Sequence, residues 1–233
     1  MTDYRPIPHV GERLPPQTML DHAESFHQTL EARRSIRFFS DEAVDPRLIE
    51  YAVRIASTAP SGANRQPWRF VVVDDPDLKH KIRVAAEEEE RISYEGGRMP
   101  EAWLDALRPL GTDWKKPFLE VAPYLVVLFK QVWSPDDEGR KVNNYYVNES
   151  VGIAAGMFIA AIQMMGLSTL THTPSPMGFL QDILGAPTHE KAYLLLPVGH
   201  PTPDCVVPDI QRKPLADVIA WNHGERPWPE TTT

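Results

Sequence analysis

The chain has 233 residues, of which 42% are hydrophobic and 24% are charged, as in an ordinary globular domain of α/β size. Its formal net charge of −8 argues against a nucleic-acid-binding protein, because such proteins need basic side chains to neutralise phosphates. The single cysteine, Cys205, excludes an intrachain disulfide framework and a cysteine-based zinc site.

Two segments bear on location. Residues 1–16 are polar and rich in proline and lack the apolar core of a signal peptide, so we expect a reduced, cytoplasmic setting. Residues 151–167 are almost continuously apolar, but a membrane-spanning helix needs roughly 20 such residues. We therefore expect a helix that packs in the core or against another subunit. Gly152 and Gly156, one turn apart, indicate either a close helix–helix contact or only a small-residue core helix.

Several helices can be predicted, and we take them in chain order. The segment from Met19 to about Arg33 is one candidate, and three dipeptides place an N-cap residue before a proline, which is typical of a helix start: Asp45-Pro46, Asp75-Pro76 and Ser175-Pro176. We expect the second of these helices to reach Tyr94, and the third to end at Gly185.

Four short aliphatic runs between chain breakers predict strands, at residues 69–73, 124–129, 168–173 and 192–198. Strands that alternate with helices indicate an α/β or α+β sheet protein. The remaining prolines crowd the two ends of the chain, where we expect extended arms or tails.

Several kinds of site have no support in the sequence. It contains no dinucleotide-binding GxGxxG after a strand, no P-loop and no HExxH, and its histidines show no ligand spacing, so no metal site is expected. Cys205 has no basic neighbour in the sequence that would make it reactive.

The first positive feature is the run Arg33-Arg34-Ser35-Ile36-Arg37, a dense cationic cluster in an acidic protein. Guanidinium groups and a hydroxyl suit a phosphate group, although arginines near a helix C-terminus also simply complement the helix dipole. A second feature is the loop 58–68, whose small residues let the backbone approach a planar ligand.

Taken together, RRSIRFFS at residues 33–40 and APSGANRQPWRF at residues 59–70 resemble the FMN-dependent nitroreductase superfamily. Further segments resemble its iodotyrosine deiodinase branch, in the form of the soluble bacterial members: EEEERISY at 87–94, TDWKKPFLEVAP at 112–123, THTPSPMG at 171–178, HEKAYLLLPVGHP at 189–201 and VPDIQRKPL at 207–215.

The resemblance implies an α+β sandwich with the nitroreductase-like fold, in which helices flank a central mixed sheet. It also implies a domain-swapped homodimer that builds each flavin site from both subunits. We expect an N-terminal arm at 1–20, an FMN-binding domain at 21–215 with a lid over about 87–118, and a C-terminal tail at 216–233.

For the cofactor, the resemblance implies FMN contacts from Arg33, Arg34, Ser35, Arg37, Pro60, Ser61, Gly62, Thr171, His172, Thr173 and Arg212. Thr173 matches the residue that donates a hydrogen bond to flavin N5, which makes it the catalytic candidate. His172 departs from the family pattern, which has threonine there; a contact through its backbone would leave the site unchanged.

For the substrate, the resemblance implies contacts from Glu90, Tyr94, Lys116 and the backbone N–H of Ala63. A free amino acid is a zwitterion, and Glu90 and Lys116 supply one partner for each of its charges. Without the resemblance, the glutamates at 87–90 are better interpreted as a solvated helix face. Lys115 is an alternative to Lys116.

The implied activity is reductive removal of halide from halotyrosines, with NAD(P)H or another reductant as the electron donor and no metal, nucleic-acid or membrane partner. Two alternatives remain open at this point. One is a general nitroreductase or quinone reductase, and the other is a protein that binds a flavin or a tyrosine derivative without turnover.

Overall fold

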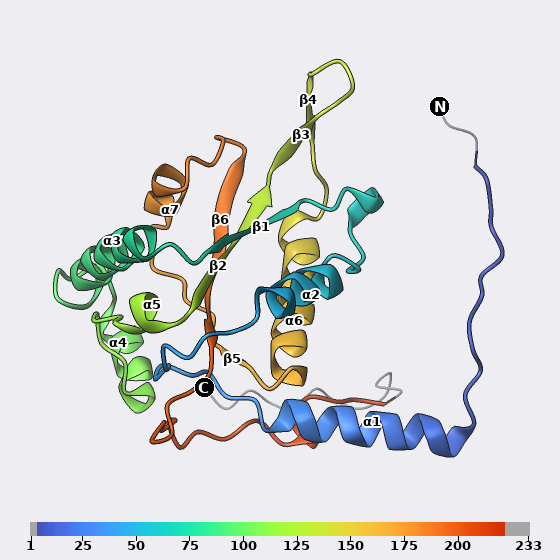
Figure 1. Ribbon diagram of the computed structural model, residues 1–233, viewed down its shortest axis with the longest axis horizontal. Helices are drawn as coiled ribbons and strands as arrows, with labels where there is room; N and C mark the ends of the chain where they lie inside the picture. Colours follow the sequence, from blue (N-terminus) through green and yellow to red (C-terminus); the bar gives the residue numbers. More distant parts are fainter. Residues whose placement is uncertain (1–3, 222–233) are drawn as a thin grey trace.

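The computed structural model describes residues 4–221, and its centre is a four-stranded sheet in the order β1-β2-β6-β5 (Figure 1). The strands are β1 (Trp68–Val73), β2 (Tyr124–Gln131), β5 (Ser168–Thr169) and β6 (Glu190–Gly199). Each neighbouring pair of these strands is antiparallel. A separate hairpin, formed by β3 (Trp133–Pro135) and β4 (Lys141–Asn143), projects beyond β2.

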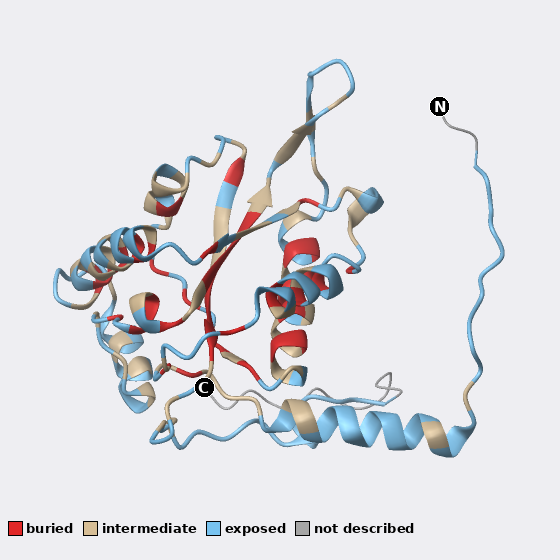
Figure 2. Ribbon diagram, in the orientation of Figure 1, coloured by how far each residue is buried: buried red, intermediate tan, exposed pale blue. Residues whose placement is uncertain are grey.

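The sheet is buried on both faces, which explains why its central strands read as continuous aliphatic runs. In β2, residues 125–129 are all fully buried (Figure 2). Leu125, Val127 and Phe129 belong to one hydrophobic core, which includes residues of α3 (Pro76–Tyr94), α5 (Phe118–Val121) and α7 (Gly178–Ile183). Val126 belongs to a second core with residues of α2 (Pro46–Ala56) and α6 (Val147–Met164). The fold is therefore a helix–sheet–helix sandwich with hydrophobic core on each face of the sheet.

Two helices begin where an aspartate precedes a proline, as predicted. The Asp45 carboxylate accepts from the Arg47 N–H at 2.9 Å where α2 (Pro46–Ala56) begins. The Asp75 carboxylate accepts from the Leu78 N–H at 2.8 Å where α3 (Pro76–Tyr94) begins. The other helical elements are α1 (Pro16–Glu31), α4 (Glu101–Leu107), α5 (Phe118–Val121), α6 (Val147–Met164) and α7 (Gly178–Ile183), with the 3-10 turns η1 (Gly62–Asn64), η2 (Arg108–Leu110) and η3 (Leu215–Asp217).

The predicted helix start at Ser175-Pro176 is wrong. Helix α7 begins at Gly178, and its N-cap residue, Met177, makes no side-chain capping bond. The backbone carbonyl of Ser175 instead accepts a hydrogen bond from Arg98 at 2.6 Å, and Ser175 takes no part in the helix. The predicted end at Gly185 is confirmed, because this residue has the left-handed φ of 63° that glycine adopts most easily.

The predicted strand at 168–173 is shorter than expected. β5 ends at Thr169, and His172 then pairs again with Leu195 of β6 in the same register. That register places Leu170 opposite Pro197, which has no N–H to donate, so the ladder is interrupted there. The four strands pair antiparallel where a mixed sheet was expected, and a parallel pairing occurs at an isolated bridge between Ser35 and Thr169.

Helix α6 is long and apolar enough to cross a membrane by length and composition alone. In the fold it is a core helix, because the residues along one side of it are buried: Ser150, Val151, Ala154, Ala155, Phe158, Ala161 and Ile162. The expectation of a buried helix in this region is confirmed.

The division into an arm, a domain and a tail stays a prediction. Parts of the expected arm and tail, at residues 1–3 and 222–233, lie outside the described residues. Helix α1 begins at Pro16, within the expected arm, and η3 begins at Leu215.

Candidate active site

The basic segment at residues 33–37 follows α1 and lies beside β5. The Ile36 N–H donates to the Thr169 carbonyl at 3.3 Å. Arg212 reaches this segment from the far end of the chain and donates to the Arg33 carbonyl at 2.7 Å. Burial, and then the positive charges of Arg212 and Arg34, lower the pKa of Arg33. An anion placed here would relieve that repulsion, so the cluster suits a phosphate group.

A cavity of about 240 Å³ adjoins this segment and is lined by Arg33, Ser35, Ile159, Thr169, Leu170 and Thr171. Thr171 and Thr173 are exposed, whereas His172 between them is buried. His172 exchanges both of its backbone hydrogen bonds with Leu195, so the backbone groups of its two neighbours point away from β6. The Thr171 and Thr173 side of this segment is therefore available to a ligand.

The loop at residues 60–66 is tightly constrained. Three residues other than glycine have positive φ angles, namely Ala63 at 49°, Asn64 at 53° and Gln66 at 49°. A Cβ atom on Gly62 would lie 2.8 Å from the carbonyl oxygen of Tyr145, so the close approach requires glycine. The Gly62 N–H donates to the Ser150 hydroxyl at 3.2 Å. Strained backbone of this kind clusters at functional sites.

The structure does not bring this loop to the basic segment within one chain. Figure 1 shows the turn between α2 and β1 well separated from the segment that follows α1. Across residues 4–221, no hydrogen bond or ion pair joins residues 60–66 to residues 33–37. The expected flavin contacts therefore fall into two separate groups.

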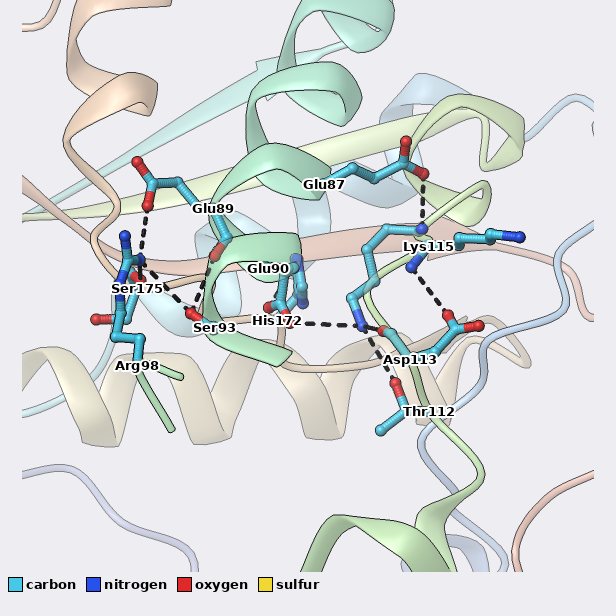
Figure 3. Close-up of polar contacts among 11 residues, drawn as sticks. Glu87, Glu89, Glu90, Ser93, Arg98, Thr112, Asp113, Lys115, His172 and Ser175 are labelled. Carbon is cyan, nitrogen blue, oxygen red and sulfur yellow. Dashed lines mark hydrogen bonds and ion pairs between the residues drawn. The ribbon is translucent and has the colours of Figure 1, made fainter. Parts of the chain in front are cut away.

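A second group of side chains lies where α3 faces the loop before α5 (Figure 3). Lys116 Nζ is 3.7 Å from Glu90 Oε2, and these side chains are only 4% and 10% exposed. Lys116 Nζ also lies 5.4 Å from the centroid of the Tyr94 ring, one turn beyond Glu90 on α3. Lys115 is exposed and lies over Trp114 instead. The structure thus brings Glu90, Tyr94 and Lys116 together and leaves Lys115 outside.

Lys116 is held by contacts that the sequence reasoning missed. Its backbone N–H donates to the Glu87 carboxylate at 2.7 Å. Its ammonium group donates to the Thr112 hydroxyl at 3.2 Å and to the Asp113 carbonyl. The spacing of Glu87 and Glu90, three residues apart on one helix, was the available sign that both face the same way. Glu88, by contrast, is exposed, so only part of the acidic run is a solvated face.

Burial outweighs attraction in this pair. It raises the pKa of Glu90, although the charge of Lys116 opposes the change. It also lowers the pKa of Lys116, although the charges of Glu90 and Asp113 act in the opposite direction. Each charge is therefore costly here unless an opposite charge stays close.

A larger cavity, of about 540 Å³, lies between the basic segment and the loop before α5. Ser35 and Arg37 line it together with the segments 109–113 and 206–208, and Lys115, unlike Lys116, is also among its lining residues. Arg37 is close enough for its charge to lower the pKa of Lys116. Arg37 thus links the basic segment electrostatically to the Glu90–Lys116 pair, although neither residue of the pair lines this cavity.

Arg98 is a further residue that no motif marks. Its guanidinium reaches the Glu89 carboxylate at 2.7 Å and the Ser175 carbonyl at 2.6 Å (Figure 3). It ties the region after α3 to the segment that follows Thr173.

Most of the chain is similar to known proteins. The nitroreductase family model matches residues 30–200. The iodotyrosine deiodinase of Haliscomenobacter hydrossis is 53% identical over 213 residues, which cover 91% of this chain and 96% of that protein. Iodotyrosine deiodinase 1 of Homo sapiens is 46% identical over 214 residues, which cover 91% of this chain and 74% of that protein. A crystal structure of oxidized iodotyrosine deiodinase bound to FMN and 3-iodo-L-tyrosine matches with a TM-score of 0.70 and 31% identity, covering 81% of this chain and 95% of that chain.

Proposed function

Since the chain belongs to the nitroreductase family, and within it to the iodotyrosine deiodinases, we propose that it uses FMN to remove halide reductively from halotyrosines such as 3-iodotyrosine. The observation that carries this proposal is the buried Glu90–Lys116 pair. The ammonium and carboxylate groups of a free amino acid need one acidic and one basic partner, and this pair supplies both. A general reductase of nitro compounds or quinones has no need of it.

The residues fit FMN. Arg33, Arg212 and Ser35 offer charge-assisted and hydroxyl donors for the phosphate group beside the 240 Å³ cavity. Arg34, Arg37, Thr171 and the backbone of His172 complete the proposed contacts from this part of the chain. Bound FMN supplies the reducing electrons, which no side chain here can provide. Thr173 is the proposed catalytic residue and donates from its hydroxyl to flavin N5.

The substrate contacts follow from the second group. Glu90 pairs with the ammonium group, Lys116 pairs with the carboxylate, and Tyr94 adds a hydroxyl and an aromatic wall. The backbone N–H of Ala63 donates to the phenolate oxygen. Residues 87–118 act as the lid, and the exclusion of water beneath it strengthens each of these charged contacts.

We further propose a domain-swapped homodimer, in which Pro60, Ser61 and Gly62 of one chain complete the flavin site of the other. The separation of loop 60–66 from the basic segment supports this arrangement. Helix α6 also leaves apolar side chains uncovered, with Ile153 46% and Met164 53% exposed.

The proposal includes a cytoplasmic location and NAD(P)H or another reductant as the electron donor, with no nucleic-acid or membrane partner.

The test is anaerobic incubation of the dithionite-reduced holoprotein with 3-iodotyrosine, with iodide and tyrosine both quantified. 2-Iodophenol, which has the same reacting ring without either charge, is the matched control. We expect stoichiometric iodide from 3-iodotyrosine and little from 2-iodophenol. Equal release from both would favour a general nitroreductase or quinone reductase, whereas binding of 3-iodotyrosine without iodide release would indicate a protein that only binds it.

A further inference from the structure

His172 carries a buried imidazole to which the proposed function gives no role. Its side chain is only 7% exposed. Nε2 has no hydrogen-bond partner among the residues that the structure describes. Buried polar side-chain atoms nearly always have such a partner, so an unpaired one calls for an explanation.

The ring is fixed with this nitrogen facing Glu90. Nε2 lies 4.0 Å from Glu90 Oε1, while the other carboxylate oxygen faces Lys116 Nζ at 3.7 Å (Figure 3). The edge-to-face contact with Phe118, at 5.9 Å and 87°, fixes the ring plane. The backbone of His172 is held by its two hydrogen bonds to Leu195.

The imidazole is neutral at working pH. Burial, and then the positive charges of Lys116 and Arg37, lower the pKa of His172 to about 3. A neutral ring has one N–H, and the carboxylate that faces Nε2 favours the tautomer with the proton there. The gap of 4.0 Å is about 1 Å longer than a hydrogen bond, so the donation requires the ring and the carboxylate to approach by about that distance.

We propose that His172 is a positioning residue, which donates from Nε2 to Glu90 Oε1 and holds this carboxylate toward the ammonium group of the amino-acid substrate. This inference rests on the proposed function. When Lys116 turns to the substrate carboxylate, Glu90 loses its present partner, and His172 is the donor that stays beside it. Selectivity for amino acids over simple phenols then depends on a side chain that touches neither substrate nor flavin.

The experiment measures binding rather than turnover. The oxidised holoprotein is titrated with 3-iodotyrosine and with 2-iodophenol, and Kd is followed by quenching of flavin fluorescence. The donor is removed in His172→Leu and His172→Phe and is kept in His172→Gln. Phe118→Leu is the matched control, because it loosens the packing of the ring and leaves the donor in place.

We expect His172→Leu and His172→Phe to raise Kd for 3-iodotyrosine about 5- to 20-fold while Kd for 2-iodophenol and FMN content stay unchanged. His172→Gln should bind 3-iodotyrosine within about threefold of the wild type, and Phe118→Leu should keep the ratio of the two Kd values. Equal weakening of both ligands, or unchanged Kd in the donorless variants, would overturn the role of His172. A wild-type protein that does not prefer 3-iodotyrosine would instead refute the proposed function.

Discussion

Lys116 Nζ lies 3.7 Å from Glu90 Oε2 in a nearly closed environment, so two opposite charges neutralise each other where we propose that an amino acid binds. A zwitterion brings the same two charges with it. Its arrival exchanges one buried ion pair for two, and no charge is left without a partner.

The Glu90–Lys116 pair, which we call the clamp, should set substrate preference. Glu90→Gln and Lys116→Met should each lower kcat/KM for 3-iodotyrosine about 10- to 150-fold, since a hydrogen bond to a charged group is worth about 1.5–3 kcal/mol. Activity on 2-iodophenol should change little, because that phenol carries neither charge. Lys115→Met is the matched control and should stay near the wild type. The clamp would be refuted if kcat/KM for both substrates fell by the same factor in these variants.

Removal of one partner should destabilise the fold in a pH-dependent manner. In Lys116→Met the Glu90 carboxylate is buried without its cation, and the expected cost at pH 8 is about 3–5 kcal/mol. Burial already raises the pKa of Glu90 in the folded chain, and the loss of Lys116 raises it further. The folded state then holds a proton that the unfolded state releases, so stability falls as pH rises through the folded pKa.

Urea unfolding at pH 5 and pH 8 checks this prediction. The double variant Glu90→Gln/Lys116→Met has no buried charge at either position and serves as the reference. The gap in unfolding free energy between the single and the double variant should shrink at pH 5. A gap of the same size at both pH values would contradict this account.

The basic segment should determine flavin retention. Arg33→Ala/Arg37→Ala should weaken FMN binding about 10²- to 10⁴-fold, because two charge-assisted bonds are lost. Flavin absorbance per chain after purification measures the occupancy. Arg91→Ala, which removes an arginine that pairs with Glu88 on α3, should keep its FMN. Full occupancy in the double variant would show that the phosphate binds elsewhere.

Loss of the Thr173 hydroxyl should affect deiodination and nitro reduction differently. Thr173→Val keeps the shape of the side chain without the donor, and it should slow release of iodide while reduction of a nitroaromatic compound continues. Thr173→Ser restores the hydroxyl and should recover the deiodination rate to within about tenfold. FMN content should be equal in all three proteins. Equal slowing of both reactions in Thr173→Val would remove Thr173 from this role.

Local chemistry allowed part of the fold to be predicted. The starts of α2 and α3 follow from Asp45 and Asp75, since a capping carboxylate and the N–H groups that it accepts from lie within three residues. Ser175 shows the limit of this reasoning. Its partner is Arg98, which is 77 residues away in the sequence, and no local pattern reveals that contact.

In the candidate site, too, motifs predict some residues, whereas others depend on contacts that are distant in the sequence. Glu90, Tyr94 and Lys116 could be named from motifs, and the structure brings them together. The break after β5 could not be foreseen, because it depends on which residue of β6 lies opposite Leu170. The inward turn of Glu87 likewise depends on the loop that carries Lys116.

The separation of the turn at Gly62 from the basic segment has a genetic consequence. In the proposed homodimer, Gly62→Ala and Arg33→Ala/Arg37→Ala each spoil both sites when every chain carries the same change. A mixed dimer contains one chain of each kind. One of its two sites then receives both substituted segments, and the other site is built entirely from unchanged segments. Coexpression of the two inactive chains in equal amounts should therefore restore roughly a quarter of wild-type activity, through complementation between subunits.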